Sequence, residues 1–77
     1  MSKLQIIGAK RMEKLLFLLG FKKIRQKGSH AFYKHPDGRT TTLPHHRKRV
    51  LAPPLIREIL REIEITVDDY DSYLKKL

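Results

Sequence analysis

The segment Pro36-Asp37-Gly38 predicts a tight turn, and it constrains the fold more than any other part of the sequence. Proline presets φ at the first corner of a type I turn, aspartate suits the second corner, and glycine accepts a positive φ. Residues 31–34 and 39–43 on either side are rich in aromatic and β-branched side chains, which favour strands. We therefore expect an antiparallel hairpin whose turn spans residues 35–39.

A helix and a further strand are predicted ahead of this hairpin. Between residues 10 and 19, apolar side chains recur at the i, i+3, i+4, i+7 spacing of an amphipathic helix: Met12, Leu15, Leu16 and Leu19. Gly8 stands where the N-cap would fall, and Gly20 follows the last leucine, where a left-handed conformation favours glycine. Residues 21–27 have the length of a strand. Residues 4–7 form a short apolar arm that could pair as a strand or lie over the core.

A second helix and a short terminal helix are predicted after the hairpin. Pro53 and Pro54 fit only the first turn of a helix, and apolar residues at helical spacing follow them: Leu55, Ile56, Ile59, Leu60 and Ile63. Thr66 and Asp69 approximate a capping box for a last helix. This order predicts an α+β fold, α-β-β-β-α plus a short C-terminal helix. The helices should cover one face of a three-stranded antiparallel sheet and leave the other to solvent.

Length and composition exclude several classes of protein. With 77 residues, the chain has room for one domain, over residues 1–77. It has no cysteine, which excludes a disulfide framework and a thiolate zinc site. Its longest apolar run, residues 15–19, is far shorter than the roughly 20 residues of a membrane span. We therefore expect a cytoplasmic protein with no membrane partner.

Positive charge is concentrated in the first two thirds of the chain. Residues 1–50 hold 13 lysines and arginines against two acidic residues, a balance of +11, whereas residues 51–77 hold 4 against 6, a balance of −2. Such an uneven excess sets up a positive potential that attracts polyanions. Nucleic acid is therefore the first partner to test, although an acidic protein or an anionic lipid would feel the same field.

Several motifs follow one another along the chain: Leu19-Gly20-Phe21 at the end of the first helix, then Arg25-Gln26-Lys27-Gly28-Ser29-His30, the Pro36-Asp37-Gly38 turn, and Leu43-Pro44 followed by His46. Together they closely resemble the HicA-type mRNA interferase toxins over nearly the whole chain. The resemblance implies a fold similar to the double-stranded RNA-binding domain, cleavage of mRNA, and a cognate HicB-like antitoxin. It also implies that the histidine of the Gly-Ser-His motif, here His30, is catalytic. The chain departs from the family at Pro53-Pro54-Leu55, where a glycine-threonine-leucine sequence is usual.

The chemistry of RNA cleavage points to the same histidine. Cleavage without a metal ion needs a base for the 2′-hydroxyl proton, an acid for the leaving 5′-oxygen, and positive charge around the phosphorane. A histidine side chain, with an unperturbed pKa of about 6.5, can perform either proton transfer near neutral pH. One such group contributes roughly 10²- to 10⁴-fold, so His30 alone predicts a slow ribonuclease. The second group could be His45, His46 or a lysine.

Residues near His30 are candidates for binding the RNA backbone. Alternation along residues 21–27 places Lys23, Arg25 and Lys27 on one face, and the next strand adds Lys34. A glycine lets the backbone come close, and a serine can donate to a phosphate oxygen. The predicted substrate-binding residues are Lys23, Arg25, Lys27, Gly28, Ser29, Lys34 and His46.

Alternation along the second strand poses a difficulty. It places His30 on the same face as Phe32, which we expect in the core with Phe17 and Phe21. Either His30 precedes the regular pleat, or Gly28 marks a bulge that re-aims the histidine, and the bulge is the favoured explanation.

The roles of the remaining histidine and tyrosine, metal binding and alternative functions can also be considered. His35 is expected to cap the hairpin, and Tyr33 could either stack on a base or cover the sheet. No two histidines have i, i+4 spacing and no carboxylate accompanies them, so we expect no metal ion and no cofactor. The alternatives to a nuclease are a non-catalytic RNA-binding module of the same fold and a basic interaction protein that binds no nucleic acid.

Overall fold

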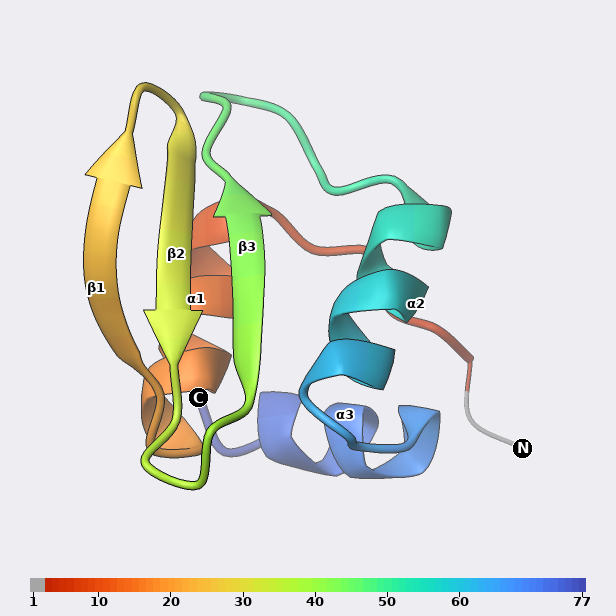
Figure 1. The fold of residues 1–77 in the computed structure, drawn as a ribbon. Helices are drawn as coiled ribbons and strands as arrows, with labels where there is room; N and C mark the ends of the chain where they lie inside the picture. Colours follow the sequence, from red (N-terminus) through yellow and green to blue (C-terminus); the bar gives the residue numbers. More distant parts are fainter. Residues whose placement is uncertain (1–2) are drawn as a thin grey trace.

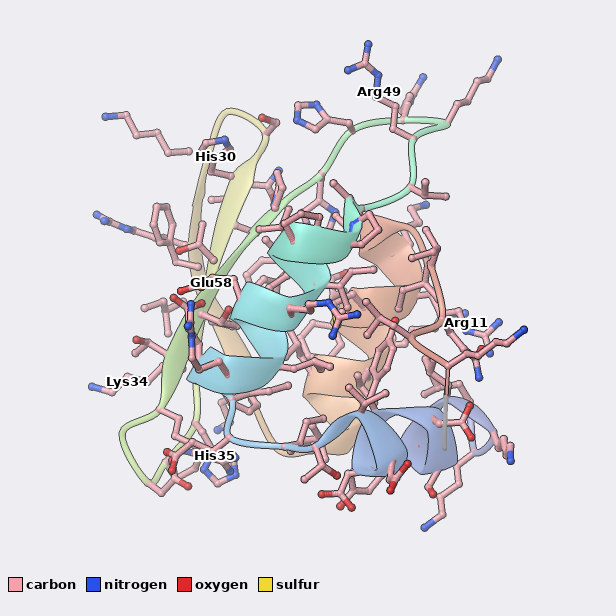
Figure 2. The ribbon with its side chains drawn as sticks, turned by 90° about the vertical axis from the view of Figure 1, so that its right-hand side faces the viewer. Arg11, His30, Lys34, His35, Arg49 and Glu58 are labelled. Atoms are coloured by element: carbon pink, nitrogen blue, oxygen red, sulfur yellow. The ribbon has the colours of Figure 1, made fainter. Side chains whose placement is uncertain are left out.

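The structure of the chain is a computed structural model that describes residues 3–77. Its elements follow in the order α1 (Ala9–Leu18), β1 (Lys22–Lys27), β2 (His30–Lys34), β3 (Thr40–Pro44), α2 (Pro53–Glu62) and α3 (Val67–Leu74) (Figure 1). The strands form one antiparallel sheet in the order β1-β2-β3. Figure 2 shows the sheet edge-on with the helices on one side of it, so the predicted α+β fold is confirmed. No helix within residues 3–77 is long and apolar enough to cross a membrane.

Helix α1 begins and ends where the two glycines predict. Gly8 is its N-cap, with extended backbone angles, and Gly20 follows the C-cap residue with a φ of 98°. The N–H of Phe21 donates to the carbonyl of Leu16 at 2.9 Å, and the N–H of Gly20 donates to that of Phe17 at 3.0 Å. This pair of bonds is a Schellman motif, in which the left-handed residue reverses the chain and leads it into β1.

Helix α2 ends in the same motif with a less suitable residue. The N–H of Ile65 donates to the carbonyl of Leu60 at 3.1 Å, and the N–H of Glu64 donates to that of Arg61 at 3.2 Å. Glu64 therefore occupies the position that Gly20 holds after α1, and its φ is 59°. A side chain with a Cβ is strained in this left-handed region.

Helix α3 has the predicted capping box. The Thr66 hydroxyl accepts from the N–H of Asp69 at 3.0 Å, and the Asp69 carboxylate accepts from the N–H of Thr66 at 3.4 Å. Two of the free N–H groups at the helix start are thereby satisfied.

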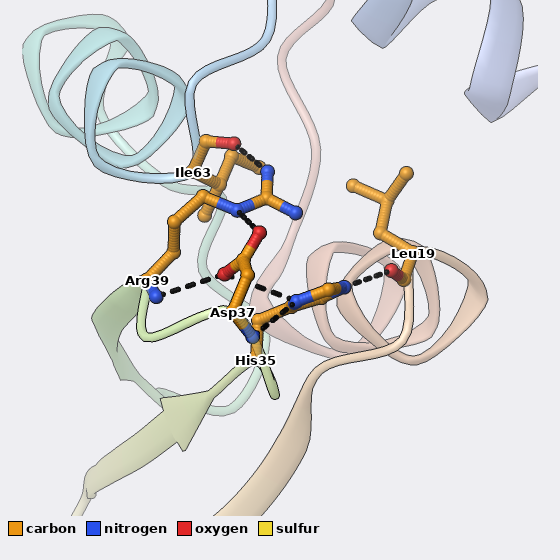
Figure 3. Close-up of polar contacts among 5 residues, drawn as sticks. All are labelled: Leu19, His35, Asp37, Arg39 and Ile63. Atoms are coloured by element: carbon orange, nitrogen blue, oxygen red, sulfur yellow. Dashed lines mark hydrogen bonds and ion pairs between the residues drawn. The ribbon is translucent and has the colours of Figure 1, made fainter.

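The turn between β2 and β3 is the tight hairpin that the sequence predicts. The N–H of His35 donates to the carbonyl of Arg39 at 2.8 Å, and Gly38 has a φ of 102°. The His35 ring bonds through Nε2 to the carbonyl of Leu19 at 3.1 Å, while the Arg39 guanidinium donates to the carbonyl of Ile63 (Figure 3). The hairpin thus joins the C-terminal ends of α1 and α2, and the capping role of His35 is confirmed.

Asp37 holds this junction together from inside the turn. Its carboxylate accepts from the backbone N–H of Arg39 at 3.0 Å and from the Arg39 guanidinium at 2.8 Å. The hydrogen bond from the backbone N–H of Arg39 is the main cause that lowers the pKa of Asp37, and the Arg39 guanidinium lowers it further. This carboxylate therefore stays ionised while it orients Arg39 toward α2.

The core lies between the sheet and the helices, and two aromatic residues differ from expectation. Tyr33 is fully buried, whereas Phe32 is only half-buried on the opposite face of β2. Phe17 on α1 is 48 % exposed, and only Phe21 is buried as predicted. Placing Phe17 and Phe32 in the core was therefore wrong. Burial also rules out the stacking of a base on Tyr33.

The apolar arm before α1 lies over the core and pairs at one point. Ile7 is buried, and its carbonyl accepts from the N–H of Leu51 at 2.9 Å. Next to it, Gly8 forms an isolated antiparallel bridge with Val50. These contacts hold the start of α1 against the segment that leads into α2.

The two Schellman motifs predict opposite effects of exchanging their left-handed residues. Glu64→Gly should raise the free energy of unfolding by about 1 kcal/mol, because glycine adopts a positive φ without steric cost. Gly20→Ala should lower it by at least about 1 kcal/mol, since the added Cβ would lie 3.1 Å from Nε2 of His35 in a residue whose φ is 98°. Urea denaturation of both variants measures the two changes, and a Glu64→Gly variant less stable than the parent would contradict the assignment.

Candidate nucleic-acid interface

His30 lies at the very start of β2, directly after a two-residue turn. Gly28 and Ser29 form this turn, with Gly28 at a φ of 60°, as a type II′ hairpin requires at its first position. His30 pairs with Lys27 on one side and with Pro44 on the other, in regular register. The expected bulge at Gly28 is therefore wrong, as is the idea that His30 precedes the pleat. The difficulty disappears because Phe32, on the same face as His30, is not a core residue.

A bulge does occur, but it lies in β1. The register shifts between Lys23 and Arg25, so that Ile24 is an extra residue, 57 % exposed. Lys23 consequently pairs with the buried Tyr33 and faces the helices, while Arg25 pairs with Phe32. The prediction that Lys23 shares a face with Arg25 and Lys27 was wrong, because one inserted residue reverses every side chain before it.

The face of the sheet that points away from the helices is cationic. It carries His30 and Phe32 of β2 together with basic residues at paired positions: Lys22, Arg25, Lys27 and Lys34. The Arg25 guanidinium lies over the Phe32 ring, 4.6 Å from its centroid. No residue of the three strands is acidic. Figure 2 shows His30 and Lys34 near opposite ends of this face, which we call the open face.

A hydrogen-bonded network lies on the other side of the sheet. The Tyr33 hydroxyl donates to Oε2 of Glu13 at 2.5 Å and lies 2.9 Å from Nε2 of His45. Lys23 contacts the same carboxylate oxygen at 3.0 Å, and His45 Nε2 is 3.5 Å from it. One carboxylate on α1 therefore connects β1, β2 and the segment after β3.

Ionisation of Glu13 is central to this network. Burial by itself would raise the pKa of Glu13, but the hydrogen bonds from Tyr33 and Lys23, with the positive charges of Lys23 and His45, outweigh it and lower that pKa. Burial, and then the hydrogen bond to Glu13 and its charge, raise the pKa of Tyr33. The carboxylate is thus the acceptor and the phenol remains a donor. This network was not anticipated, although Glu13 and Asp37 are the only acidic residues among the first 50.

The histidines after β3 point to different places. His45 continues the alternation of β3 toward the helices, where its ring meets Tyr33, so it lies on the opposite side of the sheet from His30. His46 is exposed in the loop 45–49. The N–H of His45 donates to the carbonyl of Ser29 at 2.6 Å, which holds this loop against the turn that precedes His30.

Within the part of the chain that the structure describes, no three histidine, aspartate or glutamate side chains are grouped to hold a metal ion. The histidines instead serve three separate places: His30 the open face, His35 the hairpin junction, and His45 the network around Glu13.

Comparison with known proteins agrees with this arrangement. A family model described as the HicA toxin of bacterial toxin–antitoxin matches residues 9–65. The match runs from the first residue of α1 through the whole sheet and α2, and it ends just before the capping threonine of α3. It therefore includes His30, the open face and the loop 45–49. No curated protein matches the chain.

The network around Glu13 predicts an acid-dependent contribution to stability. Glu13→Gln should lower the free energy of unfolding at neutral pH by about 1–2 kcal/mol, because a charge-assisted hydrogen bond is lost. Since the pKa of Glu13 is lower in the folded state, its contribution is present above the usual value of 4.5 and is lost as pH falls through the folded value. The difference between wild type and Glu13→Gln should therefore shrink below about pH 4.5.

Urea denaturation between neutral pH and pH 3 measures this effect. Glu58→Gln removes an exposed carboxylate that pairs with Arg61 on the surface, and it serves as the control with a small difference at every pH. A Glu13→Gln effect of constant size across this range would show that the carboxylate's charge contributes nothing.

Proposed function

Because the chain belongs to the HicA toxin family of bacterial toxin–antitoxin systems, we propose that it is a metal-independent endoribonuclease that cleaves mRNA in the cytoplasm. His30 is the proposed general acid or base, in a fold related to the double-stranded RNA-binding domain. The observation that carries this proposal is an exposed imidazole at the end of a sheet face that has four basic side chains and no acidic strand residue. Such a face attracts a polyanion and presents a proton-transfer group to it.

In the proposed reaction, the base removes the proton from a ribose 2′-hydroxyl, and the 2′-oxygen bonds to the adjacent phosphorus. The bond from phosphorus to the 5′-oxygen breaks, and the acid donates a proton to that oxygen. The products are a 2′,3′-cyclic phosphate and a free 5′-hydroxyl. Lys27, which pairs with His30, and Arg25, two residues before it, are proposed to stabilise the negative charge of the phosphorane. Gly28 and Ser29 border the same position, and Lys34 extends the binding face along the strand.

A second proton-transfer group is needed, and the two sides of the sheet separate the candidates. His45 is engaged with Tyr33 and Glu13 on the helix-covered side, away from His30. We therefore assign the second transfer to His46 in the exposed loop or to Lys27. Lys23 is left out of the RNA-binding set, because its ammonium group pairs with Glu13.

The family implies a protein antitoxin as partner, and we propose that it is HicB-like. An acidic surface placed over Arg25, Lys27 and His30 would neutralise the open face and cover the proposed catalytic group at once. The alternative function is a non-catalytic RNA-binding module. It is favoured by the fact that His30 is the single histidine among the strand residues of the open face, whereas the reaction needs two proton-transfer groups.

Replacing His30 separates cleavage from binding. His30→Ala should abolish cleavage of a purified transcript in the presence of a chelator, while thermal melting stays nearly unchanged and RNA affinity changes by a few-fold at most, since His30 is exposed. Gel analysis of product ends should show cyclic phosphates from the wild type. Equal cleavage by the variant would reject His30 as the catalyst, and no cleavage by the wild type would favour the RNA-binding module.

The bulge in β1 provides a matched comparison for RNA binding. Arg25→Ala and Lys27→Ala should each make the slope of log affinity against log salt less negative by about 0.7, the value for one phosphate contact on a single strand. Lys23→Ala removes the same charge two residues away but should leave the slope unchanged and lower the melting temperature, because Lys23 faces α1. Fluorescence titrations of a labelled RNA in a His30→Ala background measure the slopes. Equal slope changes for all three variants would contradict the separation of faces.

A further inference from the structure

A cavity lies beside the proposed cleavage site, between the loop 45–49 and the first turn of α1. Its volume is about 390 Å³, which is within the range of ligand sites. Its wall consists of Gly8, the first two residues of α1 (Ala9 and Lys10) and the loop 45–49. His45 of the Glu13 network forms part of the wall, but the four cations of the cavity belong neither to that network nor to the open face.

The side chains around the cavity are almost all basic. Two are the histidines of the loop, and the remaining charged residues are Lys10, Arg47, Lys48 and Arg49. No aspartate or glutamate lines the cavity. Four positive charges around one concave surface, with no negative charge to offset them, favour an anionic ligand.

These cations differ from the basic residues that serve the fold. Four cations elsewhere each contact a carboxylate: Lys23, Arg39, Arg61 and Lys75. Among residues 3–77, none of the four cavity cations has an ion-pair partner. Their side chains also form no hydrogen bond within the described chain. The fold therefore makes no evident use of their charge.

The loop that carries these cations is held in place at both ends. At its start, the N–H of His45 donates to Ser29 and its ring meets the Tyr33 hydroxyl. At its end, Val50 bridges to Gly8 and the N–H of Leu51 donates to Ile7. A Cβ on Gly8 would lie 3.4 Å from the carbonyl oxygen of Arg49, so the loop lies close to the start of α1. The cavity is thus a fixed part of the fold. Its cations are preorganised, which lowers the entropic cost of binding a ligand.

We propose that this cavity is a second phosphate-binding site, which receives a phosphodiester of the same RNA strand that is cleaved at His30. The inference rests on RNA as the proposed substrate but not on catalysis. His30 pairs with Pro44, and the cavity-lining His46 follows two residues later. Those two steps of extended chain span at most about 7 Å. A strand whose scissile phosphate lies at His30 therefore reaches the cavity by passing around the end of the sheet, with Lys27 and Ser29 bordering the path.

The test measures RNA binding in a His30→Ala background, so that the strand stays intact. Arg47→Ala/Arg49→Ala should weaken binding of an unstructured uridine oligonucleotide and make the slope of log affinity against log salt less negative by about 1.4, which corresponds to two phosphate contacts. Arg47→Lys/Arg49→Lys should restore most of the slope, because it restores the charge. Lys10→Ala, an exposed helix position where alanine is well tolerated, should change the slope by about 0.7 and does not perturb the loop.

Lys75→Ala/Lys76→Ala is the matched control, since it removes two charges at the end of α3, far from the cavity (Figure 1). Its slope should equal that of the parent. The proposal is overturned if the Arg47→Ala/Arg49→Ala and Lys10→Ala slopes also equal that of the parent, or if the lysine control changes as much as the arginine variant. A wild-type protein that fails to cleave RNA would reject the nuclease and leave this binding result intact, so the two failures are distinguishable.

Discussion

The hydrogen bond from Tyr33 to Glu13 is the contact on which the two sides of this sheet depend. A buried tyrosine needs a partner for its hydroxyl, and an ionised Glu13 on α1 supplies it while also pairing with Lys23 and approaching His45. The carboxylate thereby fixes helix, edge strand and post-strand loop to one another. These groups satisfy each other on the covered side, whereas the basic side chains on the other side of the sheet form no ion pair within residues 3–77.

That division of cations is a physical basis for the proposed function. Some cations support the fold through a nearby carboxylate, as Arg39 does with Asp37 and Lys23 with Glu13, and Arg11 donates to the carbonyl of Leu74. On the open face and around the cavity the basic side chains instead face solvent, and Arg25 covers the Phe32 ring. One inserted residue at Ile24 separates the two groups within a single strand, since it turns Lys23 inward and leaves Arg25 and Lys27 outward.

Local signals in the sequence were enough to predict most of the fold. The Pro36-Asp37-Gly38 turn, Gly20 after α1 and the Thr66 capping box each depend on a few adjacent residues, and all three were confirmed. The errors arose where a distant contact decides the outcome. Nothing near Ile24 signals a bulge, and the buried Tyr33 hydroxyl has its hydrogen-bond partner in Glu13, 20 positions earlier. His30 could be singled out from its local motif. The cavity could not be predicted in this way, because it forms only when the fold brings the start of α1 beside the loop 45–49.

Unpaired charge of one sign also couples stability to binding. Clustered cations repel one another and weaken the compact state, and the six acidic residues of this chain beyond residue 50 lie in or beside α2 and α3, not among these cations. A polyanion that binds the folded form removes this repulsion and stabilises the fold by RT ln(1 + [L]/Kd), about 2.7 kcal/mol at a hundredfold excess over Kd. RNA and an acidic antitoxin would both act in this way. The same surface that attracts the proposed substrate therefore makes the folded protein most stable when that surface is occupied by a polyanion.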